Sequence, residues 1–431
     1  MVGVDDYEAD DVMATYAETE KGPIRIDTGD RDLFQMVDDK RDIKVVYLAK
    51  GISQHDFFVI TVPGMEHLCR MELMRIPSFG GEIAEVSGGI AFRGKLYDGY
   101  LANLHLRTAS RILMRIETVT ASHFSRLSKK AAEIPWELYL HPGAVPLVRV
   151  STHHCRLYHK DAVAEIIMAS VRNRLTQFVN DAPPPGDPAN APGLFIRGTD
   201  DRFSVSIDSS GDLLYKRGVK TIAGNAPVRE TLAAAVLMLA GYSGSETLIN
   251  PMCGSGTFAI EGAMMARNIP PGWNRSFAFM GWPAFKPAQW RHLRNAAEKN
   301  IVTGPLPPVF AIDRTSSTCE LLTRLVSSLS ALDQIQVLEK DFFDLCPKDL
   351  SAEPGLVVIN PPYGKRMGTR RESRLLIQDV MRKLRADYPG WRFALMVPDR
   401  SDVGVISAHW RFHTIYHGGL KLELLVGKLE R

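Results

Sequence analysis

The chain has 431 residues, of which 45% are apolar and 23% are charged, and its formal net charge is +3. This length predicts two or three domains, and no apolar run approaches the ~20 residues that span a bilayer, so we expect no membrane partner. Five scattered cysteines without a CxxC pair argue against a disulfide framework or a zinc ribbon. With an acidic start unlike a signal or transit peptide, the expected location is the cytoplasm.

Charge is distributed unevenly along the chain. Residues 1–50 contain 13 Asp and Glu against 7 Lys and Arg, which leaves 36 Asp and Glu against 45 Lys and Arg in the remainder. The net charges are therefore −6 and +9. A basic remainder permits a face that binds phosphate, although a solvated surface with a mild cationic excess is the common alternative.

Residues 1–54 are acidic and mostly polar, and we interpret them as a partly disordered extension with one strand at 43–48. The next segment, 55–117, has a β-α-β-β-α-β order, which is the ferredoxin-like pattern. Its predicted elements are a strand at 57–62, a helix through 65–74, a hairpin at 83–92, a helix at 97–109 and a strand at 111–116.

A second small α/β unit is predicted over 118–215. It has a strand at 145–150, a long helix at 162–178, and strands at 193–197 and 202–207. The proline-rich segment 182–188 cannot form regular structure and is predicted to be a loop.

From about residue 216 onward, strands alternate with helices, which predicts a doubly wound sheet. A helix over 226–240 has Pro227 in its first turn, where proline is tolerated. Seven strands are expected, and the last two have no helix between them, which indicates a parallel sheet closed by an antiparallel hairpin. They lie at 247–250, 309–312, 335–338, 356–359, 393–397, 411–416 and 421–426.

The strand at 356–359 stops at Asn360-Pro361-Pro362-Tyr363-Gly364. Four apolar residues predict a buried parallel strand, and two prolines then force a rigid extended loop. This loop lies at the carboxyl end of the strand, where open α/β sheets bind their ligands.

These residues suit the binding of a planar group that carries an exocyclic amine. The lone pair of such an amine is delocalised into the ring, so the amine is a poor nucleophile. Asn360 Oδ1 and the Pro361 carbonyl can accept its two hydrogens and expose the lone pair, while Tyr363 stacks on the ring. The alternative is a proline-rich strand exit with an exposed tyrosine.

A glycine loop follows the first strand of this sheet and opens a helix. Its glycines permit close approach of a ligand, and the helix N-terminus presents unpaired N–H groups. The G-x-G-x-x-A spacing is a weak signal, because a purely structural strand-turn-helix also explains it. The candidate binding residues in the loop are Asn250, Pro251, Cys253, Gly254, Ser255, Gly256 and Thr257.

Two acids follow the next two strands. Asp313 can accept both hydroxyls of an adenosyl ribose, and Asp341 can accept an adenine amine beside the aromatic wall of Phe342. A nicotinamide enzyme places its ribose acid about 20 residues after the glycines, whereas 57 residues separate Gly256 from Asp313. Either acid alone also fits a turn residue, but sites at successive strand ends favour a binding pocket.

Other candidate groups carry less information. His153, His154, Cys155 and His159 are the densest set of potential metal ligands, but neighbouring strand residues point to opposite faces, so we expect no metal. Cys253 has no paired histidine in the sequence and is interpreted as a small loop residue. The basic residues Lys216, Arg217 and Arg229 are candidate phosphate contacts or part of a solvated helix face. Aromatic side chains in the loop 268–286 either wall a substrate base or, as we favour, bury that loop.

Several long segments resemble the THUMP-containing rRNA guanine-N2 methyltransferases of the RlmL type. They are LLYKRG at 213–218, APVRETLAA at 226–234, the 250–257 loop, the 360–364 loop, and upstream TVPGMEHLCRMEL, RTASRILMRI and IDSSGDLLYKRG. The resemblance covers about residues 55–430.

This resemblance implies a class I (Rossmann-like) methyltransferase domain with a seven-stranded sheet over 216–431. It also implies a ferredoxin-like domain over 55–117 and a THUMP RNA-binding domain over 118–215. The implied cofactor is S-adenosyl-L-methionine, the implied partner is structured RNA, and the implied target is guanine N2 in large-subunit (23S) ribosomal RNA.

The sequence departs from this family in three ways. Asn250 replaces the usual aspartate, residues 1–54 have no counterpart in the family, and the second methyltransferase domain of some members is absent. Guanine N2 in tRNA and adenine N6 in nucleic acid remain alternative targets of the same motif. A catalytically inert RNA-binding assembly factor is the alternative of another class, and Asn250 is its one hint.

Overall fold

A computed structural model describes residues 24–28, 43–47, 54–181, 191–219, 228–362, 369–417 and 419–430. The chain divides into two compact units, residues 1–55 and residues 56–431. In the first unit, β1 (Ile24–Thr28) and β2 (Ile43–Tyr47) pair in parallel. Strand β2 confirms the predicted strand at 43–48, while most of the rest of the predicted acidic extension lies outside the described residues.

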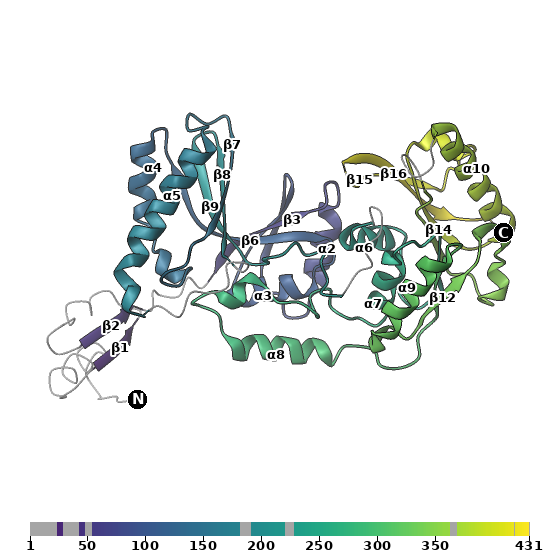
Figure 1. Cartoon of the computed structure of the whole chain (residues 1–431), viewed down its shortest axis with the longest axis horizontal. Coiled ribbons are helices and arrows are strands. Elements are labelled where there is room, and N and C mark those ends of the chain that lie inside the picture. Colours follow the sequence, from purple (N-terminus) through teal and green to yellow (C-terminus); the bar gives the residue numbers. More distant parts are fainter. Residues whose placement is uncertain are drawn as a thin grey trace. The chain divides into compact units, whose positions relative to one another are not determined.

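The second unit begins with the predicted β-α-β-β-α-β order (Figure 1). Alternating burial explains its first strand, in which Phe57 and Val59 are buried, Phe58 and Ile60 are half-buried and Asp56 is exposed. The six elements are β3 (His55–Thr61), α2 (Glu66–Arg75), β4 (Glu82–Val86), β5 (Gly89–Gly94), α3 (Leu96–His105) and β6 (Ala109–Thr120).

The following segment adds three strands to the same sheet. Its elements are α4 (Phe124–Ala132), β7 (Leu147–His153), α5 (Lys160–Leu175), β8 (Gly193–Thr199) and β9 (Arg202–Asp208). The order across this seven-stranded sheet is β4-β5-β3-β6-β9-β8-β7.

Strand β6 joins the two halves of this sheet. Residues 109–114 pair with β3 and residues 113–120 pair with β9, both antiparallel. The predicted boundary between residues 117 and 118 therefore falls inside one strand. One hydrophobic core contains side chains from both halves, including Phe57, Trp136 and Phe203. The two predicted units are thus continuous in structure.

The carboxy-terminal part is the predicted doubly wound sheet, with strand order β12-β11-β10-β13-β14-β16-β15. The first five strands of this order pair in parallel and the last two pairs are antiparallel. The strands are β10 (Leu248–Pro251), β11 (Val309–Asp313), β12 (Ile335–Glu339), β13 (Leu356–Ile359), β14 (Arg392–Val397), β15 (Arg411–His417) and β16 (Leu420–Lys428).

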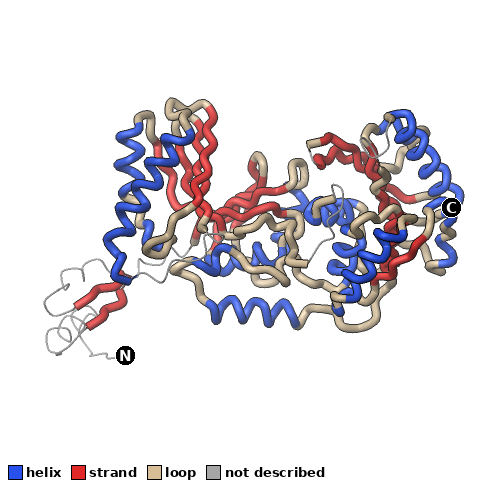
Figure 2. The backbone as a smooth tube through the Cα atoms, viewed as in Figure 1, coloured by secondary structure: helices blue, strands red, loops and turns tan. Residues whose placement is uncertain are grey.

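Helices cover both faces of this sheet (Figure 2). They are α6 (Glu230–Leu239), α7 (Thr257–Ala266), α9 (Ser316–Ser327) and α10 (Arg370–Asp387). Helix α8 (Pro287–Glu298) packs instead on the core of the first sheet, through Trp290 and Leu293. Leu237, Ala263 and Leu322 pack with one set of strand side chains, and Val380 and Leu384 pack with the other. Burying each such side chain contributes roughly 1.5–3 kcal/mol, which explains the uninterrupted apolar strands.

The order of the strands reverses at β10, which has β11 on one side and β13 on the other. The chain runs outward through β11 and β12 and then returns to place β13 beside β10. Such a switch point leaves a crevice at the carboxyl ends of the strands. Among the described residues, no helix is long and apolar enough to span a membrane.

Candidate active site

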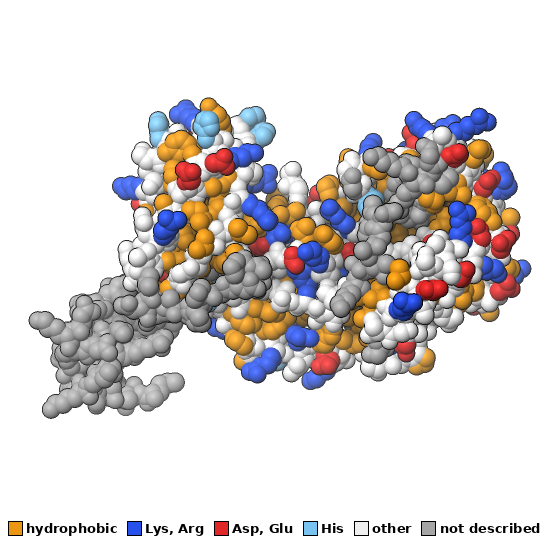
Figure 3. All heavy atoms as spheres, viewed as in Figure 1, with side chains coloured by type: hydrophobic (Ala, Val, Ile, Leu, Met, Phe, Trp, Pro, Cys, Tyr) orange, Lys and Arg blue, Asp and Glu red, His pale blue; other side chains and the backbone are white. Residues whose placement is uncertain are grey.

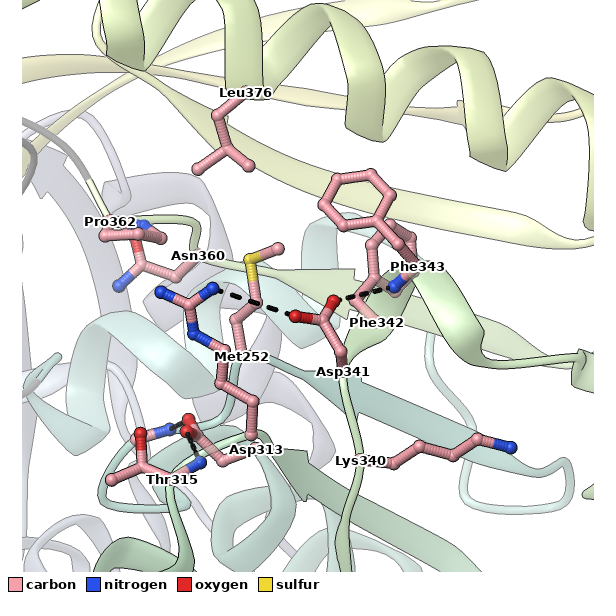
Figure 4. Close-up of a pocket in the computed structure, with 12 residues that line it drawn as sticks. Met252, Asp313, Thr315, Lys340, Asp341, Phe342, Phe343, Asn360, Pro362 and Leu376 are labelled. Carbon is pink, nitrogen blue, oxygen red and sulfur yellow. Dashed lines mark hydrogen bonds and ion pairs between the residues drawn. The ribbon is translucent and has the colours of Figure 1, made fainter.

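A cavity of about 330 Å³ lies where β10, β11, β12 and β13 end (Figure 4). Sites for small molecules typically measure about 300–1,000 Å³. Each of these strands ends in a segment that contributes to the wall of the cavity. These segments supply, among others, Gly254, Asp313, Asp341 and Asn360. The structure thus brings together all four segments that the sequence singled out.

Asn360 follows β13, whose four side chains are fully buried. Its Oδ1 is buried and accepts no hydrogen bond from any described group. An unpaired buried acceptor costs about 1–3 kcal/mol, and such a group calls for a functional explanation. Here the atom belongs to a side chain that lines the cavity.

The two prolines hold this acceptor in place. Pro361 is buried and Pro362 lines the cavity. Their fixed φ angles prevent the loop from continuing either a helix or the sheet. Tyr363 and Gly364 lie outside the described residues, so the predicted stacking of Tyr363 stays a prediction.

The glycine loop has a left-handed backbone at Met252 (φ 52°), Gly254 (φ 53°) and Gly256 (φ 73°). A Cβ on Gly256 would lie 2.7 Å from Leu322 of α9, whereas a Cβ on Gly254 would meet nothing within 4 Å. Gly256 therefore serves packing, and Gly254 leaves open space beside the cavity. Met252 also lines the cavity, and its left-handed conformation, rare for a residue that is not glycine, has no signature in the sequence.

Asp313 links the glycine loop to the end of β11. Its Oδ2 accepts from the Gly254 N–H at 3.0 Å and its Oδ1 from the Thr315 N–H at 3.0 Å. A carboxylate has about four lone-pair sites, so about two stay available for a ligand. The predicted acid is in the wall of the cavity, and it also shapes the loop.

Asp341 and its neighbours form the wall beyond β12. Asp341 Oδ1 accepts from the Phe343 N–H at 2.9 Å, and Oδ2 lies 3.7 Å from Arg314 Nη1. Phe342 is 2% exposed and Phe343 is 40% exposed, and both line the cavity. The sequence identified Asp341 and Phe342 but missed Arg314 and Phe343, because only the fold shows that these two face the same space.

Asn250 is 1% exposed within β10. Its Nδ2 donates to the Val358 carbonyl of β13 at 3.0 Å, and its Oδ1 has no partner among the described groups. An aspartate lacks that donor, so the asparagine adds a side-chain link between two central strands. Pro251 ends β10 in register with Ile312.

The remaining loop residues lie beside the cavity without lining it. The hydroxyls of Ser255 and Thr257 lie 3.1 Å apart, and Thr257 begins α7. Burial, with a further contribution from the negative charge of Asp313, raises the pKa of the Cys253 thiol far above its ordinary value. A thiol that stays protonated is a poor nucleophile, which agrees with its interpretation as a loop residue.

The three basic residues predicted to contact phosphate lie apart from the cavity. Lys216 is exposed and lies 2.9 Å from Asp212, and Arg229 lies over the ring of Tyr215 at 5.3 Å. Arg217 is 3% exposed and its Nε lies 2.8 Å from Glu261 Oε1. This burial replaces the predicted phosphate contact of Arg217 with a structural ion pair.

The aromatic loop is buried, as favoured from the sequence. Phe277, Phe279 and Trp282 belong to the core of the first sheet, and Phe279 stacks on Tyr100 with ring centroids 4.3 Å apart. These side chains fix the loop before α8. They are not part of the cavity wall.

The histidines lie at the end of β7, in a part of the surface rich in histidine (Figure 3). His154 has φ 51°, and its ring centroid lies 3.9 Å from that of His153. The expectation that these two side chains point to opposite faces is therefore wrong, because β7 ends at His153. Within the described residues, no group of three potential ligands has metal-binding geometry.

Comparison with known families gives three matches. Residues 217–416 match the RMKL-like methyltransferase domain, and residues 56–113 match the RlmL ferredoxin-like domain. Residues 1–62 match the N-terminal resolvase-like domain of 5′-3′ exonucleases. Most of this last segment lies outside the described residues, and none of its described residues lines the cavity.

Among curated relatives, ribosomal RNA large subunit methyltransferase K/L of Methylococcus capsulatus is 31% identical over 382 residues. The match covers 86% of this chain and 51% of that protein. The chain thus spans about half the length of the curated relatives it matches.

Two solved structures are similar in fold. A possible methylase from Clostridium difficile 630 has a TM-score of 0.77 at 25% identity, covering 88% of this chain and 99% of that one. SMU.472, a putative methyltransferase complexed with SAH, has a TM-score of 0.76 at 24% identity over the same shares of the two chains.

Proposed function

We propose that this chain, whose residues 217–416 form a methyltransferase domain of the RMKL-like type, transfers a methyl group from S-adenosylmethionine to an exocyclic amine in RNA. The proposed target is guanine N2 in large-subunit ribosomal RNA. The observation that carries the proposal is the buried Asn360 Oδ1, which has no partner in the described structure and belongs to a side chain that lines the cavity.

The residues of the cavity fit S-adenosylmethionine. Gly254 leaves open space, and Asp313 and Asp341 present carboxylates at the ends of neighbouring strands. Asp313 would hold the ribose hydroxyls, and Asp341 would accept from the adenine amine. Met252 and Phe343 would supply apolar contacts to the adenosine.

The chain's own residues prepare the amine. Asn360 Oδ1 and the Pro361 carbonyl would accept its two hydrogens, and Tyr363 would stack on the base. Acceptors fixed by a buried strand and two prolines cost no reorganisation during the reaction. The donor supplies a methyl carbon to the amine nitrogen as the carbon–sulfur bond breaks, and the surplus proton on nitrogen passes to water.

The relatives support the choice of RNA. The Methylococcus capsulatus relative is named for methylation of large-subunit ribosomal RNA. The SAH bound to SMU.472 supports the choice of methyl donor and not the choice of RNA. A guanine within a helix would have to be extruded to reach the cavity. In this proposal residues 118–215 form a THUMP domain that engages structured RNA, and the site of action is the cytoplasm.

The test combines donor binding with identification of the product. The purified chain is titrated with S-adenosylmethionine in a calorimeter and then incubated with unmethylated ribosomal RNA, which is digested to nucleosides for mass spectrometry. We expect donor binding and N2-methylguanosine. N6-methyladenosine would move the proposal to adenine, and RNA binding without donor binding would favour the assembly factor.

A further inference from the structure

Most residues on the outward face of the sheet formed by β6, β9, β8 and β7 are exposed or half-buried, while Ser206 and Asp208 are buried. Alternation along each strand separates it from the core: Leu194, Ile196, Phe203 and Val205 are buried, while the residues between them on β8 and β9 point away. Helices α4 and α5 pack on the core side of these strands (Figure 2).

Three cross-strand rows on the outward side carry a regular set of side chains. The register of the strands aligns β7, β8, β9 and β6 in each row, which gives twelve positions. Four of them are exposed arginines: Arg115, Arg149, Arg197 and Arg202. Six more are hydroxyl side chains: Thr118, Thr120, Ser151, Thr199, Ser204 and Ser206. The last two of the twelve positions are His153 and Phe195. We call these twelve positions the arginine face.

The arginine face has no acidic member. Glu117 aligns with the core-facing Val205 and so belongs to the opposite side. Asp208, in the row beyond, is nearly buried and is bonded to Arg111. None of the four arginines of the face forms an ion pair with another described residue. Two acids border the face in the turn between Thr199 and Arg202: Asp200 lies 3.8 Å from His154, and Asp201 lies 3.6 Å from Arg156. Among the described residues the four arginines have no such partner, so they can bind a polyanion.

Two features fix the geometry of the face. The Arg149 guanidinium lies 5.3 Å from the centroid of the half-buried Phe195 ring, and Arg111 lies 5.3 Å from the same ring. Adjacent strands lie about 4.8 Å apart and alternate residues about 6.7 Å apart. The face therefore measures roughly 14 Å by 14 Å and is held by a continuous ladder of backbone hydrogen bonds.

We propose that the arginine face binds the sugar–phosphate backbone of RNA. Arginine and hydroxyl side chains are the usual donors to phosphate oxygens. Of the twelve positions only Phe195 is apolar, and one exposed aliphatic side chain, Leu147, borders the face beside Arg149. The core of a protein interface is richer in apolar anchors. Recognition of a backbone is independent of base sequence, so this surface holds the RNA while the cavity selects the nucleotide. The inference rests on the proposed RNA substrate.

The test uses the full chain and a fluorescein-labelled 12-nucleotide oligouridylate. Anisotropy titrations at several KCl concentrations compare the wild type with Arg115→Gln/Arg149→Gln/Arg197→Gln/Arg202→Gln. Each lost phosphate contact on a single strand lowers the slope of log K against log salt by about 0.7. We expect the four substitutions to lower the slope by up to roughly 2.8 and to weaken binding at least about tenfold at 0.1 M salt.

A matched control removes the same charge from the helix side. Arg126, Lys129, Lys160 and Arg172 are exposed on α4 and α5, and their replacement by glutamine should leave affinity and slope within twofold of the wild type. Equal weakening by both variants, an unchanged arginine-face variant, or no binding of the oligonucleotide by the wild type would each overturn the proposal.

Two further measurements complete the test. The first uses only the wild type, so it does not depend on the folding of the fourfold variant, and the second distinguishes failure of this proposal from failure of the proposed function. Crosslinking of 4-thiouridine RNA to the wild type should label peptides within 111–120, 147–153 or 193–208, and labels only elsewhere would refute it. In a methyl-transfer assay the arginine-face variant should bind S-adenosylmethionine normally and show a raised KM for RNA with little change in kcat. Absence of donor binding in the wild type would instead refute the proposed function.

Discussion

Replacement of Asn360 by alanine should reduce methyl transfer without reducing the stability of the fold, because of the position of its Oδ1 atom. Asn360 Oδ1 is buried without a partner among the described groups. Leaving such an acceptor unpaired costs about 1–3 kcal/mol in the folded state. Asn360→Ala removes that cost together with the remainder of the amide, so the variant should be as stable as the wild type or slightly more stable.

The same substitution should strongly reduce methyl transfer. Removing one preorganised hydrogen-bonding group from an active site typically lowers kcat about 10²–10³-fold, or roughly 2.7–4 kcal/mol of transition-state stabilisation. Because Asn360 touches the substrate amine in this scheme, affinity for S-adenosylmethionine should change little.

The assay compares single-turnover methyl transfer, calorimetric donor binding and urea unfolding for the wild type, Asn360→Ala and Asn360→Asp. The aspartate variant keeps an oxygen acceptor in nearly the same shape, so it should retain more activity than the alanine variant. Full turnover by Asn360→Ala would refute the role of this side chain. A loss of stability above about 1 kcal/mol would show instead that the amide is structural.

Three further predictions follow from other residues. Gly256→Ala should destabilise the protein by roughly 1–2 kcal/mol in thermal or urea unfolding, because it combines a positive φ of 73° with a Cβ 2.7 Å from Leu322. Gly254→Ala places its Cβ in open space, so it should destabilise the protein less and should weaken donor binding. Equal stability of the two variants would contradict this. Glu261→Ala leaves the guanidiniums of Arg107 and Arg217 without their shared buried carboxylate and should cost about 3–5 kcal/mol in urea unfolding. Glu133→Ala, at the exposed pair with Lys130, should leave stability nearly unchanged, and an equal loss in both variants would contradict this. Burial, aided by the charge of Arg107, lowers the pKa of His105 to about 4. The unfolded chain therefore binds more protons than the folded chain between about pH 6.5 and 4, and the free energy of unfolding falls with pH in that window by at most roughly 3 kcal/mol. His105→Gln should flatten this part of the stability profile, and an unchanged profile would refute the assignment.

The order of elements and the position of the cavity were predictable from local sequence patterns. The strand at 356–359 was predictable because four apolar residues end at two prolines, and the glycine loop because glycines follow a strand and open a helix. Parallel strands place their carboxyl ends on one edge, so Gly254, Asp313, Asp341 and Asn360 were expected together. These are local signals, and neighbouring residues in the chain create them.

Which polar side chains are paired and which are unpaired depends on contacts between residues far apart in the chain. Arg217 reads as a surface cation in the sequence, yet Glu261, 44 residues away, holds it in a buried ion pair. The continuity of β6 across two predicted units depends on pairing with β3 and β9 on opposite sides. The arginine face likewise exists only through register, because residues far apart in the chain become neighbours when strands pair.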